Sequence, residues 1–367
     1  MVGENLSIKD LNNFLCTCCE LSNLFTPRLH KLGLQNVGSI SALQWAAKHG
    51  HESLVKLAIS KGAKVNEITK CEHKFTVLHL AARSTSPNPQ IIRTLVEHGA
   101  KVGAKSSDGC TPLYMATCYG HGQVVEELLK LGAGTKQGVY DRLSSLAHVA
   151  ASKGYADCMR AFVAAGIDFN HRGYLCQTIL HVAIAYGSGF EMAQYLLRQE
   201  EVSITVNAKD INGSTPLHLL MGHYNLTSAE KGELLRSLLQ CGADIHAKDD
   251  YGDTPAHIAS NRDDINSINK LIHAGFNISM KGAGGDTVLH RAVCGRGRGM
   301  KFLLDLEAGR SIINVRNKKG ATPLHVAVEK CDRVKVELLL KYGANSDLQD
   351  GQGRTPSQLA LFLGNEV

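Results

Sequence analysis

The chain has 367 residues, of which 44% are hydrophobic and only 5% aromatic, with Trp45 as the single tryptophan. This composition suits a long core of small side chains and argues against a globular enzyme with a deep pocket. The net charge of +6 is too small to predict nucleic-acid binding, and no apolar run of about 18 residues predicts a transmembrane helix.

The first 40 residues differ in pattern from the rest of the chain. From Leu11 to Phe25, apolar residues recur at steps of three and four, which predicts an amphipathic helix. Pro27 ends this helix or begins another turn. The simplest interpretation of residues 1–40 is a helical segment that caps the structure following it.

A short motif then recurs ten times: a Thr or Ser, an apolar turn residue that is often Pro, and usually Leu-His. Successive copies are separated by 33 residues at the closest, as between Thr254 and Thr287, and by 39 at most, between Thr215 and Thr254. A period of about 33 residues is typical of a stacked array of helix pairs. The ten Thr or Ser positions are Ser41, Thr76, Thr111, Ser145, Thr178, Thr215, Thr254, Thr287, Thr322 and Thr355.

The third copy predicts how one unit folds. Thr111 and Pro112 indicate the start of a helix, because Thr is a good N-cap and Pro fits the first helical position. Gly120 indicates the turn to a second helix, which Gly132 ends through a left-handed cap. One such unit cannot bury its apolar face alone, so neighbouring units must stack.

These motifs resemble those of ankyrin-repeat proteins, over residues 41–363. The resemblance implies an all-α solenoid of stacked helix-turn-helix units with projecting loops or β-hairpins. We expect residues 41–367 to form nine complete repeats and a tenth that is truncated after one helix. Insertions are expected in the sixth repeat, around His223 to Gly232, and after the second helix of the fifth, around Glu200 to Thr205; such loops lie off the stacking surface.

The N-terminal segment carries a second resemblance. The stretch from Leu6 to Leu21 is similar to the latter part of an F-box, and a similar segment often precedes the repeats of fungal ankyrin proteins. In that family the motif binds the small adaptor of cullin-type ubiquitin ligases. Because the opening Leu-Pro and the first helix of an F-box are missing, three interpretations of residues 1–40 stay open: a cap, a vestigial F-box and a working one.

Seven histidines recur at the motif position, one per repeat. They would lie about 10 Å apart in a stack, too far to share a metal ion. The resemblance implies that each imidazole hydrogen-bonds the backbone of the neighbouring loop. These residues are His79, His148, His181, His218, His257, His290 and His325.

Other candidate chemical motifs give weak signals. Cys16-Thr17-Cys18-Cys19 contains a Cys-x-x-Cys pair, but it falls inside the predicted helix and lacks further ligands. The basic stretch Gly295–Gly299 is interpreted as a solvated turn, with contact to an acidic partner as the alternative. No phosphate-binding loop, nucleophile elbow or zinc helix is found. We therefore predict no enzymatic activity and no cofactor or metal.

The cysteines and the first residues bear on location. Eleven cysteines show no framework spacing, and residues 1–10 lack the basic and apolar order of a secretion signal. An intracellular protein with reduced thiols, cytoplasmic or nuclear, is expected.

Proteins of this resemblance bind partners at the loop tips and the exposed ends of the first helices, which together form a concave groove. Aromatic and arginine residues are the preferred energetic anchors of protein interfaces. Neighbouring charges of opposite sign at the tips argue against one electrostatic stripe and favour a protein over nucleic acid. The residues predicted to bind a partner protein are Tyr119, Tyr186, Lys209, Asp210, Lys248, Asp249, Tyr251, Arg262, Arg316 and Lys318.

The predicted function is that of a non-enzymatic scaffold for protein–protein interaction, with a regulatory role such as transcription coregulation. The alternative is an F-box-like substrate receptor of a cullin-type ubiquitin ligase. In either case the partner is another protein in the groove. No small-molecule substrate, direct nucleic-acid contact or membrane association is expected.

Overall fold

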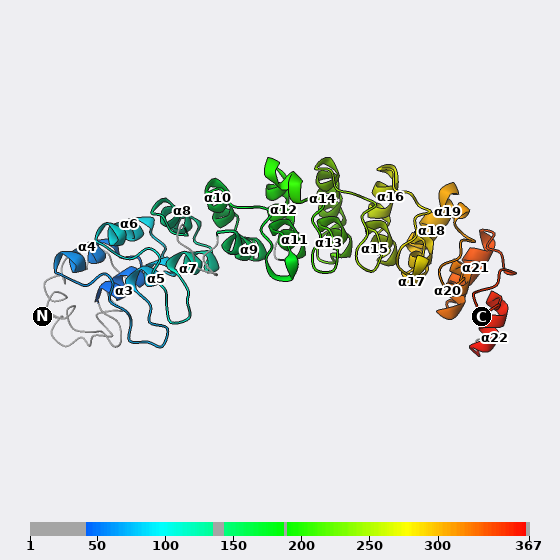
Figure 1. Ribbon diagram of the computed structural model, residues 1–367, viewed down its shortest axis with the longest axis horizontal. Helices are drawn as coiled ribbons and strands as arrows, with labels where there is room; N and C mark the ends of the chain where they lie inside the picture. The colour runs from blue at the N-terminus through cyan, green and yellow to red at the C-terminus, as the bar shows by residue number, and fades with distance from the viewer. Residues whose placement is uncertain (1–41, 135–142, 187–188, 365–367) are drawn as a thin grey trace, which may run out of the picture. The chain divides into compact units, whose positions relative to one another are not determined.

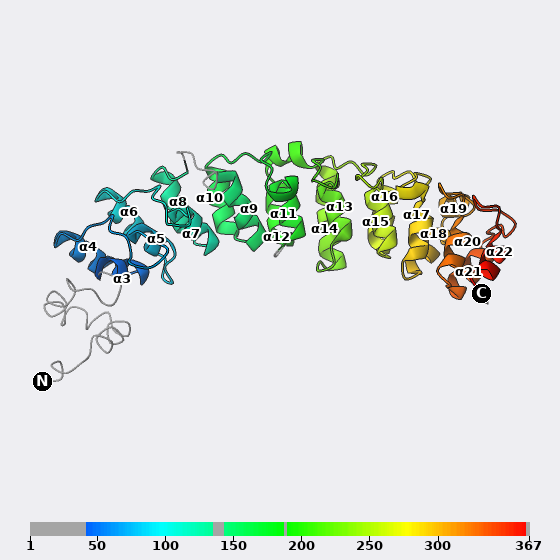
Figure 2. The same ribbon diagram turned by 60° about the horizontal axis from the view of Figure 1, so that its bottom comes forward.

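The computed structural model describes residues 42–134, 143–186 and 189–364, and the chain divides into two compact units. Unit 1 comprises Met1–Ala150 and Tyr155–Ile167, and unit 2 comprises Ala151–Gly154 and Asp168–Val367. Each unit is a series of helix pairs joined by loops (Figures 1 and 2). The predicted helical segment over residues 1–40, with its F-box resemblance, lies outside the described residues.

In unit 1, first helices pack against first helices and second helices against second helices of the neighbouring repeat. Fully buried aliphatic side chains such as Ile92 and Leu128 form its core. The first helices are α3 (Ala42–Lys48), α5 (Val77–Ala82), α7 (Pro112–Cys118) and α9 (Leu143–Lys153), of which α9 ends in unit 2. The second helices are α4 (Glu52–Ser60), α6 (Pro89–Glu97), α8 (Gly122–Lys130) and α10 (Ala156–Ala164).

Unit 2 follows the same plan. Its first helices are α11 (Ile179–Ala185), α13 (Pro216–Gly222), α15 (Pro255–Asn261), α17 (Val288–Cys294), α20 (Pro323–Glu329) and α22 (Pro356–Phe362). Its second helices are α12 (Gly189–Leu197), α14 (Ser228–Gln240), α16 (Ile265–His273), α18 (Arg298–Asp305) and α21 (Arg333–Lys341). Shorter helices in the connections are η1 (Tyr174–Cys176), η2 (Glu200–Thr205), η3 (Ala283–Gly285) and α19 (Glu307–Ser311).

The motif threonines begin the first helices, as predicted. The side chain of Thr111 accepts a hydrogen bond from the backbone N–H of Tyr114 at 3.2 Å, and Pro follows at the first helical position. The fourth copy is an exception, because α9 begins at Leu143 and Ser145 lies inside it. The missing Pro does not explain this difference, because Thr76, Thr178 and Thr287 also lack a following Pro and still begin their helices. The other threonine N-caps are Thr76, Thr178, Thr215, Thr254, Thr287, Thr322 and Thr355.

The two predicted insertions are present. The one in the sixth repeat forms a shorter loop than predicted, because part of it is helical. In the sixth repeat α13 ends at Gly222 and α14 already begins at Ser228, so part of the insertion lengthens α14 to 13 residues. A capping box explains the early start: the Glu230 carboxylate accepts a hydrogen bond from the backbone N–H of Thr227 at 2.8 Å. In the fifth repeat, the predicted extension forms the 3-10 helix η2.

The loops between repeats are projecting turns rather than paired strands. The part of the chain that the structure describes contains one isolated β-bridge, between Ile68 and Thr76. A typical turn is closed by a hydrogen bond from the Asp249 backbone N–H to the Asp253 carbonyl, at 2.9 Å, and by one from the Gly252 backbone N–H to the Asp249 carbonyl, at 3.0 Å. Gly252 adopts the positive φ of 94° that this turn requires. The predicted all-α solenoid is confirmed, with loop tips in place of hairpins.

Candidate protein-interaction site

The motif histidines hold the loop tips in place. Nδ1 of His218 accepts a hydrogen bond from the backbone N–H of Thr215 at 3.2 Å, and its Nε2 lies 3.1 Å from the Asp253 carbonyl oxygen of the next repeat. Because Nδ1 accepts, Nε2 carries the proton and donates it. The expected structural role is confirmed for six histidines, namely His79, His181, His218, His257, His290 and His325.

Burial lowers the pKa of five of these imidazoles, because the charged ring would lose its hydration. The shift has this direction and this largest cause in His79, His181, His218, His257 and His290. The neutral ring is also the form that the hydrogen bonds require. The histidines therefore order the loops without adding charge to the surface.

Aspartates close the loop tips from inside. Asp210 is only 8% exposed, and its carboxylate accepts hydrogen bonds from the backbone N–H groups of Asn212 and Ser214, both at 2.9 Å. Asp249 makes the equivalent pair of bonds in the following loop. The sequence predicts that both aspartates bind a partner. Since their carboxylates are committed to their own turns, we leave them out of the surface proposed below.

The basic residues at the loop tips of unit 2 form a ladder. Nζ of Lys209 donates to the carbonyl oxygen of Lys248 at 2.8 Å, and Nζ of Lys248 donates to that of Lys281 at 2.7 Å. Lys281 continues the series with a bond to the Arg316 carbonyl at 2.8 Å. The predicted residues Lys209, Lys248 and Arg316 therefore connect successive loops while remaining exposed.

At the first-helix ends of unit 1, an arginine lies between two aromatic rings. The guanidinium of Arg83 is 5.3 Å from the ring centroid of Phe75 and 5.7 Å from that of Tyr119. Further stacking comes from His73 on Phe75 and His121 on Tyr119. Tyr119, a predicted anchor, is 48% exposed but already engaged by this cation.

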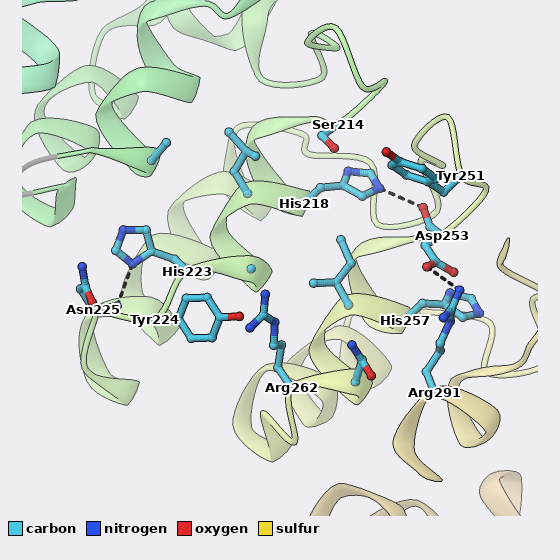
Figure 3. A pocket seen from close by; sticks show the side chains of 15 residues that line it. Ser214, His218, His223, Tyr224, Asn225, Tyr251, Asp253, His257, Arg262 and Arg291 are labelled. Atoms are coloured by element: carbon cyan, nitrogen blue, oxygen red, sulfur yellow. Dashed lines mark hydrogen bonds and ion pairs between the residues drawn. The ribbon is translucent and has the colours of Figure 1, made fainter. Parts of the chain in front are cut away.

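A cavity of about 720 Å³ opens in unit 2, on the surface formed by the loop tips and the first-helix ends, which we call the first-helix face (Figure 3). Half-buried Leu219 of α13 and Ile258 of α15 supply apolar lining. The last residues of three successive first helices, Ala185, Gly222 and Asn261, also line it. Because these residues are small or of modest size, they leave room for a ligand.

Two exposed tyrosines border the cavity (Figure 3). Tyr224 belongs to the sixth-repeat insertion and is 75% exposed, and Tyr251 belongs to the next loop tip and is 74% exposed. The guanidinium of Arg262 lies over the Tyr224 ring, 3.9 Å from its centroid. Across residues 42–134, 143–186 and 189–364, no carboxylate forms an ion pair with Arg262.

The second arginine of the cavity is neutralised within the protein. Arg291 Nη2 lies 2.8 Å from the Asp253 carboxylate, and its Nε lies 3.7 Å from that of Asp286. Asp253 also accepts a hydrogen bond from the backbone N–H of Ala283 at 2.8 Å. Of the two arginines lining the cavity, Arg262 is therefore the one with charge to offer a ligand.

The predicted partner-binding residues lie at several places. Tyr251 and Arg262 line the same cavity, and Tyr186, which is 48% exposed, directly follows one of its lining residues. Lys318 is exposed on the loop tip of the ninth repeat. Sequence reasoning missed Tyr224, because an insertion has no repeat position to compare. An exposed aromatic placed directly after a first helix is the signal that could have found it.

The basic turn Gly295–Gly299 is occupied by a carboxylate of its own chain. Asp263 is 6% exposed and accepts hydrogen bonds from the backbone N–H groups of Arg298 at 3.1 Å and Gly299 at 2.6 Å. These amides begin α18, where an anion would otherwise bind. These backbone amides are therefore not available to a partner, whereas the side chains of Arg296 and Arg298 are exposed, and contact with an acidic partner through them stays a prediction.

Residues 42–134, 143–186 and 189–364 contain neither a candidate membrane span nor a candidate metal-binding cluster. No helix there combines the length and apolar character needed to cross a membrane. No group of three or more His, Cys, Asp or Glu side chains there is placed to hold a metal ion. The Cys16–Cys19 pair lies outside these ranges.

Comparison with known families defines the class of protein. A model described as ankyrin repeats, in three copies, matches residues 12–106, 43–138, 86–173, 147–229 and 225–312, and a single ankyrin-repeat model matches residues 319–351. The chain therefore belongs to the ankyrin-repeat family.

Two individual relatives share between a quarter and a third of their aligned residues with this chain. The chain is 26% identical to the E3 ubiquitin-protein ligase KEG of Arabidopsis thaliana, over 95% of this chain and 22% of the relative. It is 29% identical to human ankyrin repeat and SOCS box protein 16, over 58% of this chain and 46% of the relative. It thus spans less than half the length of these two relatives. Among solved structures, the ankyrin repeat domain of human ASB11 aligns with a TM-score of 0.40 and 23% identity, over 73% of this chain and 98% of that one.

Proposed function

We propose that the chain is a protein-interaction scaffold that holds a partner polypeptide on the first-helix face of unit 2. The observation that carries this proposal is the cavity bordered by Tyr224, Tyr251 and Arg262. Exposed tyrosines and an exposed arginine are the residue types that dominate interface energetics, and ankyrin repeats support the same general function. The role we propose is regulatory, such as transcription coregulation, in the nucleus or the cytoplasm.

The groups around the cavity are suited to binding rather than to catalysis. His218 and His257 line it, but both ring nitrogens of each are hydrogen-bonded within the protein. A general acid or base needs a ring nitrogen within reach of substrate. The third lining histidine, His223, accepts a hydrogen bond at Nδ1 from the backbone N–H of Asn225 at 3.2 Å. The one carboxylate of the lining, that of Asp253, is held by Arg291, so no lining carboxylate is free to pair with a histidine.

Site-specific photo-crosslinking tests the proposal. A benzophenone amino acid replaces Tyr251 in the full chain, in cells that produce the chain naturally. The matched control carries the same group at Arg236, an exposed residue of α14 in the row of second helices. Protein adducts at position 251 that are absent at position 236 are expected. Adducts at position 236 alone, or at neither position, would contradict the proposal.

A second candidate function is that of a substrate receptor in ubiquitin ligation. The F-box resemblance of Leu6–Leu21 supports it, and one relative is named an E3 ubiquitin-protein ligase. Parallel pull-downs with the full chain and with a chain lacking residues 1–30 separate the two functions. A cullin and its adaptor captured by the full chain alone would favour the receptor. Their absence from both captures, together with a shared regulatory protein, would favour the scaffold.

A further inference from the structure

We propose that the cavity of unit 2 binds an extended peptide segment of the partner in which an acidic side chain lies next to an apolar one. This inference rests on the proposed function and specifies the chemistry of the partner. It follows from the charge, the apolar lining and the length of the cavity, which are independent observations.

Arg262 supplies the charge that the cavity can offer a ligand. Its guanidinium lies over the face of the Tyr224 ring, which leaves the N–H groups along its edge able to donate. A carboxylate accepts two such parallel hydrogen bonds from one guanidinium. Arg291 does not compete for the ligand, because Asp253 and Asp286 already hold it. The cavity therefore selects an acidic side chain at the Arg262 end.

Apolar side chains contribute to the lining of the same cavity. Leu219 and Ile258 are half-buried and contribute to the cavity, and Tyr251 leaves most of its ring in solvent. An apolar side chain inserted here would cover this surface and remove it from water. Since Gly222 lacks a side chain, the position beside Leu219 stays open for it.

The length of the cavity argues for a chain rather than a small molecule. Its lining runs from Ala185 of α11 through α13 to Asn261 of α15. Neighbouring helices pack at about 8–10 Å, so a ligand that reaches both ends spans about 20 Å. An extended chain covers this distance with about six residues, which leaves room for the acidic and the apolar side chain to lie at neighbouring positions.

Peptide selection tests the inference. A displayed library of random 12-residue peptides is selected on the full chain, on the Arg262→Gln variant and on the Arg236→Gln variant. Arg236 is an exposed arginine of α14 that does not line the cavity, so its variant loses the same charge elsewhere. Circular dichroism confirms that both variants fold. Peptides with Asp or Glu beside an apolar residue should be enriched by the full chain and by Arg236→Gln, and not by Arg262→Gln.

Affinity measurements make the test quantitative. The most enriched peptide is compared by fluorescence polarisation with its analogue carrying Gln for the acidic residue. The loss of one charge-assisted pair should weaken binding to the full chain about tenfold, and Arg262→Gln should remove that preference. Enriched peptides without acidic residues, or an acidic preference that survives in Arg262→Gln, would overturn the inference. So would an analogue with phosphoserine at the acidic position that binds at least about tenfold more tightly, since the ligand would then be a phosphopeptide.

The scaffold function and the inference about an acidic peptide can be contradicted separately. If no peptide is enriched but the crosslinker at position 251 still captures a protein, the inference about an acidic peptide is wrong and the scaffold stands. If neither experiment yields a ligand, both are wrong.

Discussion

The two units pair an arginine with aromatic rings at equivalent first-helix ends, with different consequences. In unit 1, Arg83 ends α5 and lies between Phe75 and Tyr119, which occupy regular positions of the repeat. In unit 2, Arg262 ends α15 and lies over Tyr224, which comes from an insertion. The inserted ring borders a cavity, whereas the two regular rings contact the same half-buried arginine. The regular repeat thus supplies a frame, and a departure from it supplies the proposed binding site.

Acid is expected to give the largest effect and to act more strongly on unit 2. A lowered folded-state pKa means that the unfolded chain binds more protons than the folded chain. The stabilisation is therefore complete above the unfolded pKa of about 6.5 and is lost as the pH falls below it. The motif histidines with a lowered pKa are His181, His218, His257 and His290 in unit 2 and His79 in unit 1. Burial also lowers the pKa of His223 in unit 2 and of His51 and His121 in unit 1, so unit 2 still has the larger set.

Thermal unfolding at pH 7.5 and pH 5.5 measures this effect. Far-UV circular dichroism follows the whole chain, and the fluorescence of Trp45, the single tryptophan, follows unit 1. We expect the midpoint to fall at pH 5.5 by both probes, and further by circular dichroism. A midpoint that does not change, or that falls further by fluorescence, would show that the histidines of unit 2 do not control its stability.

Removing one histidine should have the next largest effect. His218→Ala leaves the Thr215 N–H without its partner, removes one of the two hydrogen bonds to the Asp253 carbonyl, and opens a void at a position that is 1% exposed. Such a change costs about 2–4 kcal/mol of the free energy of unfolding, which urea unfolding measures. His273→Ala, at an exposed position of α16, is the matched control and should cost less than about 0.5 kcal/mol. Equal losses would refute the assigned role.

Substitution of Asp263 should have a smaller effect on the free energy of unfolding. Asp263 occupies the position in the seventh repeat that Gly120 occupies in the third. Both residues adopt a positive φ, 61° for Asp263 and 76° for Gly120. Asp263→Ala removes the two bonds to the start of α18 and keeps a Cβ in this conformation, at a cost of about 2 kcal/mol. Asp263→Gly relieves the conformation and should recover about 1 kcal/mol of that loss in urea unfolding. If the Gly variant is the less stable of the two, the backbone argument fails.

The loop-tip ladder should contribute least. Lys209 is exposed, and its Nζ makes one bond to the Lys248 carbonyl. Lys209→Ala should lower the free energy of unfolding by less than about 0.5 kcal/mol, because an exposed side chain loses entropy when it is held in place. A loss above about 1 kcal/mol would show that the ladder stabilises the stack.

The repeat frame could be predicted from the sequence, because each unit repeats its own local signals. Thr111-Pro112 marks a helix start by capping chemistry alone, and the recurrence of histidine at one position indicates one repeated contact. The start of α9 at Leu143 could not be predicted from Ser145, because a capping residue marks a helix start only where the residues before it are not helical.

The proposed site could be predicted only in part. Tyr251 and Arg262 hold repeat positions whose exposure follows from the frame. Tyr224 lies in an insertion, and its pairing with Arg262 depends on how that insertion folds. The hydrogen bonds of Asp210 within its own turn could not be predicted either, because an aspartate at a loop tip can equally face solvent.

The comparison of the two units is tested most directly by the affinity of the protein captured at position 251 for two variants, Tyr224→Ala and Tyr119→Ala. Tyr224 and Tyr119 are both exposed, so neither change should shift the thermal midpoint by more than a few degrees. If the insertion supplies the binding site, Tyr224→Ala weakens binding by about tenfold or more, and Tyr119→Ala by no more than about twofold. A loss that is equal in the two variants, or larger for Tyr119→Ala, would contradict the assignment of the site to unit 2.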